Sequence, residues 1–138
     1  MAFPSYNKDL GLLILRVGIG VMFILHGLPK IVGGPERWGG LGSGGLPFLP
    51  EGILPIIFGL AAAIAELGGG LLLAIGLFHR IACAGLAITM FVAFTTKLGD
   101  ISGVMNFAYA AGWPLELLIV FIALLFTGPG RYALRPAS

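Results

Sequence analysis

Long apolar runs, separated by short breaks rich in polar residues, glycine or proline, form the dominant pattern of this sequence. A membrane-spanning helix needs about 20 mainly apolar residues to cross roughly 30 Å of hydrocarbon. Runs of about that length cover residues 10–28, 53–78, 81–96 and 104–127. The pattern therefore predicts an all-α fold, an integral membrane four-helix bundle in which residues 1–138 form a single four-span membrane domain.

The connections between the runs differ greatly in length. The second and third runs meet at His79 and Arg80, which predicts a tight antiparallel hairpin. The first connection, residues 31–52, is Gly/Pro-rich, with eight glycines and three prolines, and it also carries Trp38 and Phe48. We expect this extramembrane connection to lie in the membrane interface, where Trp is enriched. The alternative is a lid that folds back over the bundle.

Composition and charge support the membrane interpretation and exclude several other classes. Apolar residues make up 58% of the chain and charged residues 10%, whereas soluble proteins have roughly 45–50% and 25%. The mean hydropathy is +1.03, so the expected environment is the lipid bilayer. The net charge of +2 comes from singly scattered basic residues, a pattern that argues against a nucleic-acid partner. A single cysteine, Cys83, excludes an internal disulfide and a CxxC relay.

The orientation in the membrane follows from the lysines and arginines that flank the runs. One side carries Lys8, Arg80, Arg131 and Arg135, and the other carries Lys30, Arg37 and Lys97. This small excess predicts an inner or plasma membrane protein with both termini cytoplasmic. The first ten residues are too polar for the apolar part of a signal peptide, so we expect the first run to be retained as an anchor.

Three ionisable residues, Arg16, Glu66 and Glu116, lie well inside the predicted spans. Each costs at least about 2.5 kcal/mol at a helix centre, so such residues rarely face lipid. We expect a buried cluster in which Arg16 bridges toward one or both glutamates. Because two acids face one base, one of the two glutamates is expected to be neutral at pH 7 and to handle protons as a catalytic residue. The alternative is that Arg16 and Glu66 form a purely structural clamp.

The first span has a polar face that extends along its length. At 100° per residue, Arg16, His26 and Lys30 fall within an arc of about 80°. We expect Arg16 to bind an anion or a quinone oxygen, with His26 and Lys30 near the outer surface at the mouth of the pocket. Tyr109 shares a helix face with Glu116, and we include it and Trp113 among the candidate substrate-binding residues.

Two further patterns concern the last two spans. Pro114 lies within the fourth span, where it removes one helix hydrogen bond and crowds the carbonyl of Ala110, so a kink is expected beside Glu116. Gly85, Thr89 and Ala93 recur every four residues in the third span, which predicts a helix-packing stripe.

The order of several short motifs resembles the DoxX family across essentially the whole chain. The motifs are LILRVGIGVMFILHGLPKI, AELGGGLLLAIGLFHRIA, ITMFVAF and GPGRYAL. The last is similar to the family ending GPGRYSLD, except that Arg135 stands where an acidic residue is usual. The resemblance implies a four-helix membrane protein. It also implies kinship with subunits of a thiosulfate:quinone oxidoreductase and with membrane parts of redox or stress-response assemblies.

Three functions are compatible with these observations. The first is a membrane subunit of a redox system, with an intramembrane Arg/Glu pocket for a quinone or a small sulfur anion. No intrinsic cofactor is evident, because the sequence contains no haem ligand pair, flavin motif or redox cysteines, so a bound quinone or a redox partner subunit must carry the electrons. The second is a non-catalytic membrane scaffold or assembly subunit. The third is a small transporter, acting as a homo-oligomer because four short helices enclose little volume.

Overall fold

The chain folds into helices that match the predicted apolar runs. A computed structural model describes residues 5–99 and 101–135. The helices are α1 (Lys8–Val32), α2 (Gly34–Gly45), α3 (Ile53–Ile75), α4 (His79–Leu98), α5 (Val104–Phe107), a π-helical turn η1 (Ala108–Gly112) and α6 (Trp113–Thr127). Four of these segments, with 104–127 counted as one, are long and apolar enough to cross a membrane. The expected all-α membrane fold is confirmed.

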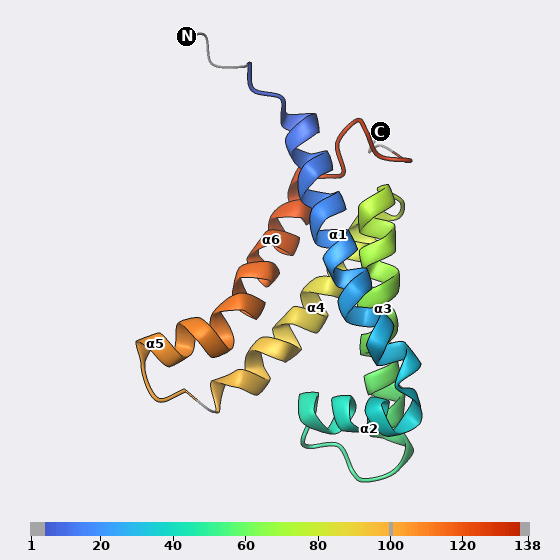
Figure 1. The fold of residues 1–138 in the computed structure, drawn as a ribbon, viewed down its shortest axis with the longest axis vertical. Helices are drawn as coiled ribbons and strands as arrows, with labels where there is room; N and C mark the ends of the chain where they lie inside the picture. Colours follow the sequence, from blue (N-terminus) through green and yellow to red (C-terminus); the bar gives the residue numbers. More distant parts are fainter. Residues whose placement is uncertain (1–4, 100, 136–138) are drawn as a thin grey trace.

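The four long segments form two pairs, α1 with α3 and α4 with α6 (Figure 1). The pairs approach one another at the end where α1 begins and α6 ends, and they diverge toward the end that holds α2 and α5. The start of α1, the end of α6 and the turn between α3 and α4 therefore lie at one end of the bundle, as the charge pattern predicts. The assignment of that end to the cytoplasm remains a prediction.

Glycines allow α1 and α3 to approach closely where they cross. A Cβ atom placed on Gly20 would lie 2.6 Å from the carbonyl oxygen of Gly70, and one on Gly70 would lie 2.7 Å from the carbonyl oxygen of Gly20. Farther along the same crossing, a Cβ atom on Gly27 would lie 2.6 Å from the backbone nitrogen of Leu67. Small residues are the usual means by which membrane helices pack backbone to backbone. These backbone contacts set the register of α1 against α3, that is, which residues of the two helices lie side by side.

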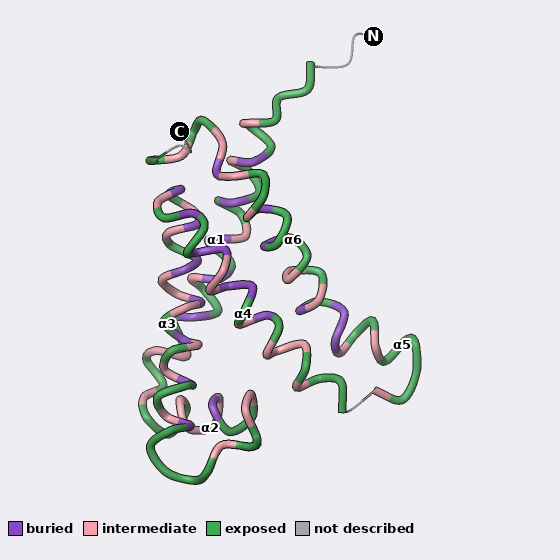
Figure 2. Tube along the Cα trace, turned by 180° about the vertical axis from the view of Figure 1, so that it is seen from behind, coloured by how far each residue is buried: buried purple, intermediate pink, exposed green. Residues whose placement is uncertain are grey.

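The buried core lies at the end of the bundle where all four segments meet. Leu73, Leu86 and Phe121 are fully buried there, and the ring of Phe121 meets that of Phe23 edge to face at a centroid distance of 5.2 Å. Elsewhere many large apolar residues are exposed, and the exposed residues are green in Figure 2. An exposed apolar surface on all four long helices is what a bilayer requires.

The long first connection contains the helix α2, which the sequence did not suggest. Glycine costs about 1 kcal/mol per residue in a helix, so packing has to stabilise this segment. It does so against α3, where a Cβ atom on Gly42 would overlap the carbonyl group of Pro55. The indole Nε1 of Trp38 also donates a 2.9 Å hydrogen bond to the carbonyl oxygen of Lys30. The connection therefore folds back onto the helices, as in the lid alternative. Its location in the membrane interface stays a prediction.

The irregularity expected at Pro114 takes the form of the π-helical turn η1, which ends immediately before α6. Pro114 has no N–H to donate, so the carbonyl of Ala110 loses its usual helical partner. Single π-helical turns are rare and often occur near functional sites.

Candidate functional site

Arg16 is buried but contacts neither glutamate, so the expected Arg16–Glu cluster is wrong. Its guanidinium donates hydrogen bonds to four carbonyl oxygens: those of Leu73 (3.4 Å), Ala74 (2.6 Å), Pro129 (3.1 Å) and Tyr132 (2.6 Å). The exposed fraction of Arg16 is 1%. The carbonyls at the end of α3 carry partial negative charge, which favours a cation there. Arg16 therefore fastens the C-terminal segment to the helix ends.

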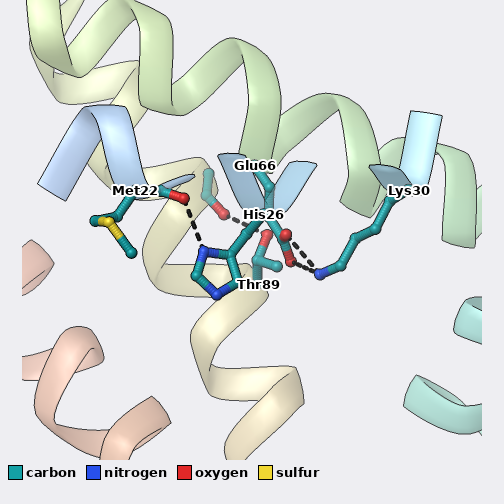
Figure 3. Close-up of polar contacts among 6 residues, drawn as sticks. Met22, His26, Lys30, Glu66 and Thr89 are labelled. Carbon is teal, nitrogen blue, oxygen red and sulfur yellow. Dashed lines mark hydrogen bonds and ion pairs between the residues drawn. The ribbon is translucent and has the colours of Figure 1, made fainter. Parts of the chain in front are cut away.

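The partner of Glu66 is Lys30. The sequence pattern predicts Lys30 near the outer surface, at the mouth of the pocket, and not beside a buried glutamate. The Lys30 ammonium is 2.6 Å from Oε1 and 2.5 Å from Oε2 of Glu66 (Figure 3). The side chain of Glu66 is 5% exposed and that of Lys30 is 24% exposed. The long lysine stem reaches along α1 while its charge stays paired, which is a common behaviour of lysine near helix ends. The argument for a surplus neutral glutamate loses its basis, because Glu66 has its own cation.

An apolar cavity of about 290 Å³ lies on one side of this ion pair. We call it the α1–α6 cavity. Its polar residues are His26, Lys30, Glu66 and Trp113. Its apolar lining comes from α1, α4 and α6 and consists of Gly18, Ile19, Met22, Phe23, Met90 and Leu117. The volume is close to the lower limit of small-molecule sites, roughly 300 Å³, and the lining has their usual character of apolar walls with a few polar groups.

His26 lines this cavity, and one of its ring nitrogens has a hydrogen-bond partner within the described residues. Its Nδ1 atom is 2.7 Å from the carbonyl oxygen of Met22, one turn earlier in α1. A carbonyl oxygen only accepts hydrogen bonds, so Nδ1 carries a proton and Nε2 is the free nitrogen of the neutral ring. Figure 3 shows the opposite edge of the ring pointing away from α1. His26 can therefore accept a hydrogen bond from a ligand, or donate one when it is protonated.

A second cavity, of about 400 Å³, lies on the other side of the same ion pair. We call it the α2–α4 cavity. Lys30 and Glu66 line both cavities. The other polar side chains of the second cavity are Thr89, Thr96 and Lys97, all on α4, and α2 contributes Gly40, Leu41, Gly44 and Gly45. The Lys30–Glu66 pair thus separates an apolar cavity from a more polar one that ends beside the exposed Lys97.

The remaining predicted site residues lie elsewhere. Glu116 is exposed in the first turn of α6, so the expectation of a buried proton-handling acid at that position is wrong. Tyr109 is 78% exposed and lines neither cavity. Of the seven predicted residues, the structure brings together His26, Lys30, Glu66 and Trp113.

Sequence reasoning missed the α4 side of the site. Thr89 and Ala93 belong to the stripe of small residues that we interpreted as helix packing, yet both line the α2–α4 cavity. The Thr89 hydroxyl donates to the carbonyl oxygen of Gly85 at 2.9 Å, which leaves its oxygen lone pairs available to accept. The signal that could have indicated a polar cavity was Thr89 within this stripe, followed by Thr96 and Lys97.

The fold and the site together define a class: a multi-span helical membrane protein with a buried ion pair between two cavities. The sequence model of the DoxX family matches residues 11–99. The chain belongs to the DoxX family.

Three curated relatives are similar over nearly the whole chain. An uncharacterized protein of Haemophilus influenzae is 35% identical over 126 residues, covering 89% of this chain and 87% of the relative. The uncharacterized membrane protein Rv3486 of Mycobacterium tuberculosis is 31% identical, covering 96% and 88%. A Bacillus subtilis protein named "Putative oxidoreductase CatD" is 35% identical, covering 93% and 87%. No solved structure gives a significant match.

Proposed function

We propose that this protein is the quinone-binding membrane subunit of a redox system, with the quinone headgroup in the α1–α6 cavity. The observation that carries the proposal is the position of the Lys30–Glu66 pair in the wall of an otherwise apolar cavity. The oxidoreductase name of the Bacillus subtilis relative supports the same class of chemistry. A bound quinone would accept two electrons and two protons on reduction, the electrons coming from a redox partner subunit.

The polar groups of the cavity suit the two oxygens of a quinone ring. An ammonium group has three N–H donors. Those of Lys30 that face Glu66 are occupied, which leaves one to donate to a ligand oxygen. His26 offers Nε2 from a neighbouring position on α1. The apolar residues Phe23, Met90 and Leu117 would hold the ring itself.

The cavity also suits a ligand that arrives from the membrane. Met22 is 51% exposed and Trp113 is 45% exposed, and both line the cavity from the outer surfaces of α1 and α6. In a bilayer those surfaces face lipid, so a lipid-soluble molecule could enter without crossing water. A small sulfur anion would not enter by that route. We therefore favour the quinone over the anion as the ligand of this cavity.

Protons would reach the ion pair from the opposite side. Glu66 is almost fully buried, yet it also lines the α2–α4 cavity together with Thr89, Thr96 and Lys97. Hydroxyl and ammonium groups can hold water in a cavity of that size. The proposal therefore separates the two paths: the quinone enters from lipid, and protons reach Glu66 through the α2–α4 cavity.

Quenching of Trp113 fluorescence by a short-chain quinone tests the proposal. Trp38 is the other tryptophan of the chain, so the Trp38→Phe variant makes Trp113 the sole reporter. We expect saturable quenching, with the dissociation constant raised about fivefold by His26→Leu, since one net hydrogen bond is worth roughly 1 kcal/mol. Tyr109→Phe is the matched control and should leave the constant unchanged. Quenching that does not saturate would favour the scaffold function instead.

A further inference from the structure

Two arginines far apart in the sequence line one cavity at the end of the bundle where α1 begins and α6 ends. The cavity has a volume of about 570 Å³ and lies where α3 turns into α4 and where α6 ends. Its basic side chains include Arg80, in the first turn of α4, and Arg135, in the C-terminal segment. We call it the basic cavity. Nothing in the proposed redox function uses it, because the Lys30–Glu66 pair lines other cavities.

Backbone hydrogen bonds hold Arg135 at this place. Its N–H donates to the carbonyl oxygen of Gly76 at 3.3 Å, and the N–H of Leu134 donates to that of Ile75 at 3.0 Å. The C-terminal segment thereby crosses the end of α3, as the red trace in Figure 1 shows. The buried Arg16 fastens the same segment through Tyr132. The position of Arg135 beside the start of α4 is therefore built into the fold.

The charges of this cavity have no acidic partner in the described part of the chain. Within residues 5–99 and 101–135, neither Arg80 nor Arg135 forms an ion pair. His79 also lines the cavity, but its Nε2 donates to the carbonyl oxygen of Leu124 at 2.9 Å. Two guanidinium groups at the start of a 20-residue helix, whose first N–H groups add positive potential, form an environment suited to an anion.

The walls of the same cavity are apolar and open toward lipid. Ile81 is 69% exposed and Phe126 is 87% exposed, and both line it beside the arginines. The ends of membrane-spanning helices lie at the level of the lipid headgroups. Basic pockets between such helix ends bind the phosphate groups of anionic lipids. A free phosphate ion would make no use of Ile81 and Phe126.

We propose that the basic cavity binds the phosphate group of an anionic phospholipid, with Arg80 and Arg135 as its ligands. The phosphate lies between the two guanidinium groups, and the acyl chains follow Ile81 and Phe126 down the outside of α4 and α6.

Native mass spectrometry of the detergent-solubilised full chain tests this site, with phosphatidylglycerol and phosphatidylcholine as probes. We expect phosphatidylglycerol to bind at least tenfold more tightly than phosphatidylcholine. Arg80→Gln and Arg135→Gln should each lower its affinity severalfold, and Arg135→Asp should lower it further. The lysine variants Arg80→Lys and Arg135→Lys should keep most of the affinity. Melting temperatures close to the wild-type value would show that these variants, changed at exposed side chains, are folded.

Arg131→Gln is the matched control, because Arg131 has the same charge and lies four residues from Arg135. It lines a different cavity, beside Asp9, and its guanidinium stacks on the ring of Tyr132. An equal loss of affinity in Arg131→Gln would show a general effect of charge and would overturn the site. Equal binding of the two lipids would overturn it as well. Displacement of phosphatidylglycerol by millimolar inorganic phosphate would identify free phosphate as the ligand and overturn the lipid assignment.

Discussion

The guanidinium of Arg16 donates a 2.6 Å hydrogen bond to the carbonyl oxygen of Ala74, on the neighbouring antiparallel helix. The contact follows from the crossing of α1 and α3, in which Gly20 lies against Gly70. Arg16 precedes Gly20 by four residues, and Ala74 follows Gly70 by four. In an antiparallel pair these two positions are level with each other. Arg16 is therefore placed at the end of α3 and not at the depth of Glu66.

Replacing Arg16 by alanine should destabilise the protein by about 3 kcal/mol or more, because four carbonyl oxygens lose a charged donor in a buried place. Arg16→Lys should recover only part of this, since one ammonium cannot reach all four. Melting curves in detergent would measure both. Limited proteolysis should also release the C-terminal segment earlier in Arg16→Ala. Rescue of Arg16→Ala by Glu116→Gln would contradict the structure, in which Glu116 is exposed on α6.

The ion pair predicts unequal effects of its two partners. Lys30→Met leaves the almost fully buried Glu66 without a cation, so it should cost about 3–5 kcal/mol. Glu66→Gln leaves Lys30, which is 24% exposed and can turn toward water, so its cost should be smaller. In the Lys30→Met/Glu66→Gln double variant, the loss of stability should be well below the sum of the two single losses. Melting curves of the three variants form a double-mutant cycle. Additive losses would exclude a direct energetic coupling.

The close crossing of α1 and α3 can be tested with two glycines on the same helix. In Gly70→Ala the new methyl group would lie 2.7 Å from the carbonyl oxygen of Gly20, so the helices must separate, at a cost of about 1–3 kcal/mol. Gly68→Ala is the matched control, because nothing lies within 4 Å of its Cβ position. We expect Gly68→Ala to be neutral or slightly stabilising, since alanine favours the helix. Equal losses in the two melting curves would argue against this crossing.

The apolar runs were enough to predict the spans, because the bilayer sets the length of a helix that crosses it. The partners of the charged residues could not be predicted in the same way. Arg16 and Lys30 share a face of α1 but are 14 residues apart, or about 21 Å along the helix. Only the register of α1 against α3 determines which of them meets Glu66. That register depends on backbone contacts at glycines, whose positions in space the sequence pattern does not give.

The helix α2 shows a second limit of the sequence. Its composition, with six glycines in twelve residues, predicts a loop by intrinsic propensity. Gly42 of α2 and Gly59 of α3 instead let the two helices lie directly on each other, because a Cβ atom on either one would overlap a backbone carbonyl group of the other helix. The α2–α4 cavity exists because of this packing. A cavity formed by a tertiary contact could not be inferred from α4 alone, although Thr89 and Thr96 were visible in the sequence.

If the quinone enters from lipid and protons reach Glu66 through water, the two cavities should differ in how readily a water-soluble reagent reaches them. Only a thiolate reacts readily with thiosulfonate reagents, and thiolates form where water is present. Single cysteines can be placed in a Cys83→Ala background, since Cys83 is the only cysteine of the chain. Ala93→Cys would line the α2–α4 cavity and Met22→Cys the α1–α6 cavity. A charged, membrane-impermeant reagent added to reconstituted vesicles should label Ala93→Cys at least tenfold faster than Met22→Cys.

The comparison has an internal control, because Met22 is the more exposed of the two side chains: it is 51% exposed, whereas Ala93 is half-buried. If exposure alone governed the rate, the order of labelling would be reversed. Labelling after unfolding in detergent should be complete for both variants, which shows that each thiol is present and reactive. Faster labelling of Met22→Cys would mean that the α1–α6 cavity opens to water. In that case the quinone would not have a separate lipid entrance, and proton delivery to Glu66 would not require the α2–α4 cavity.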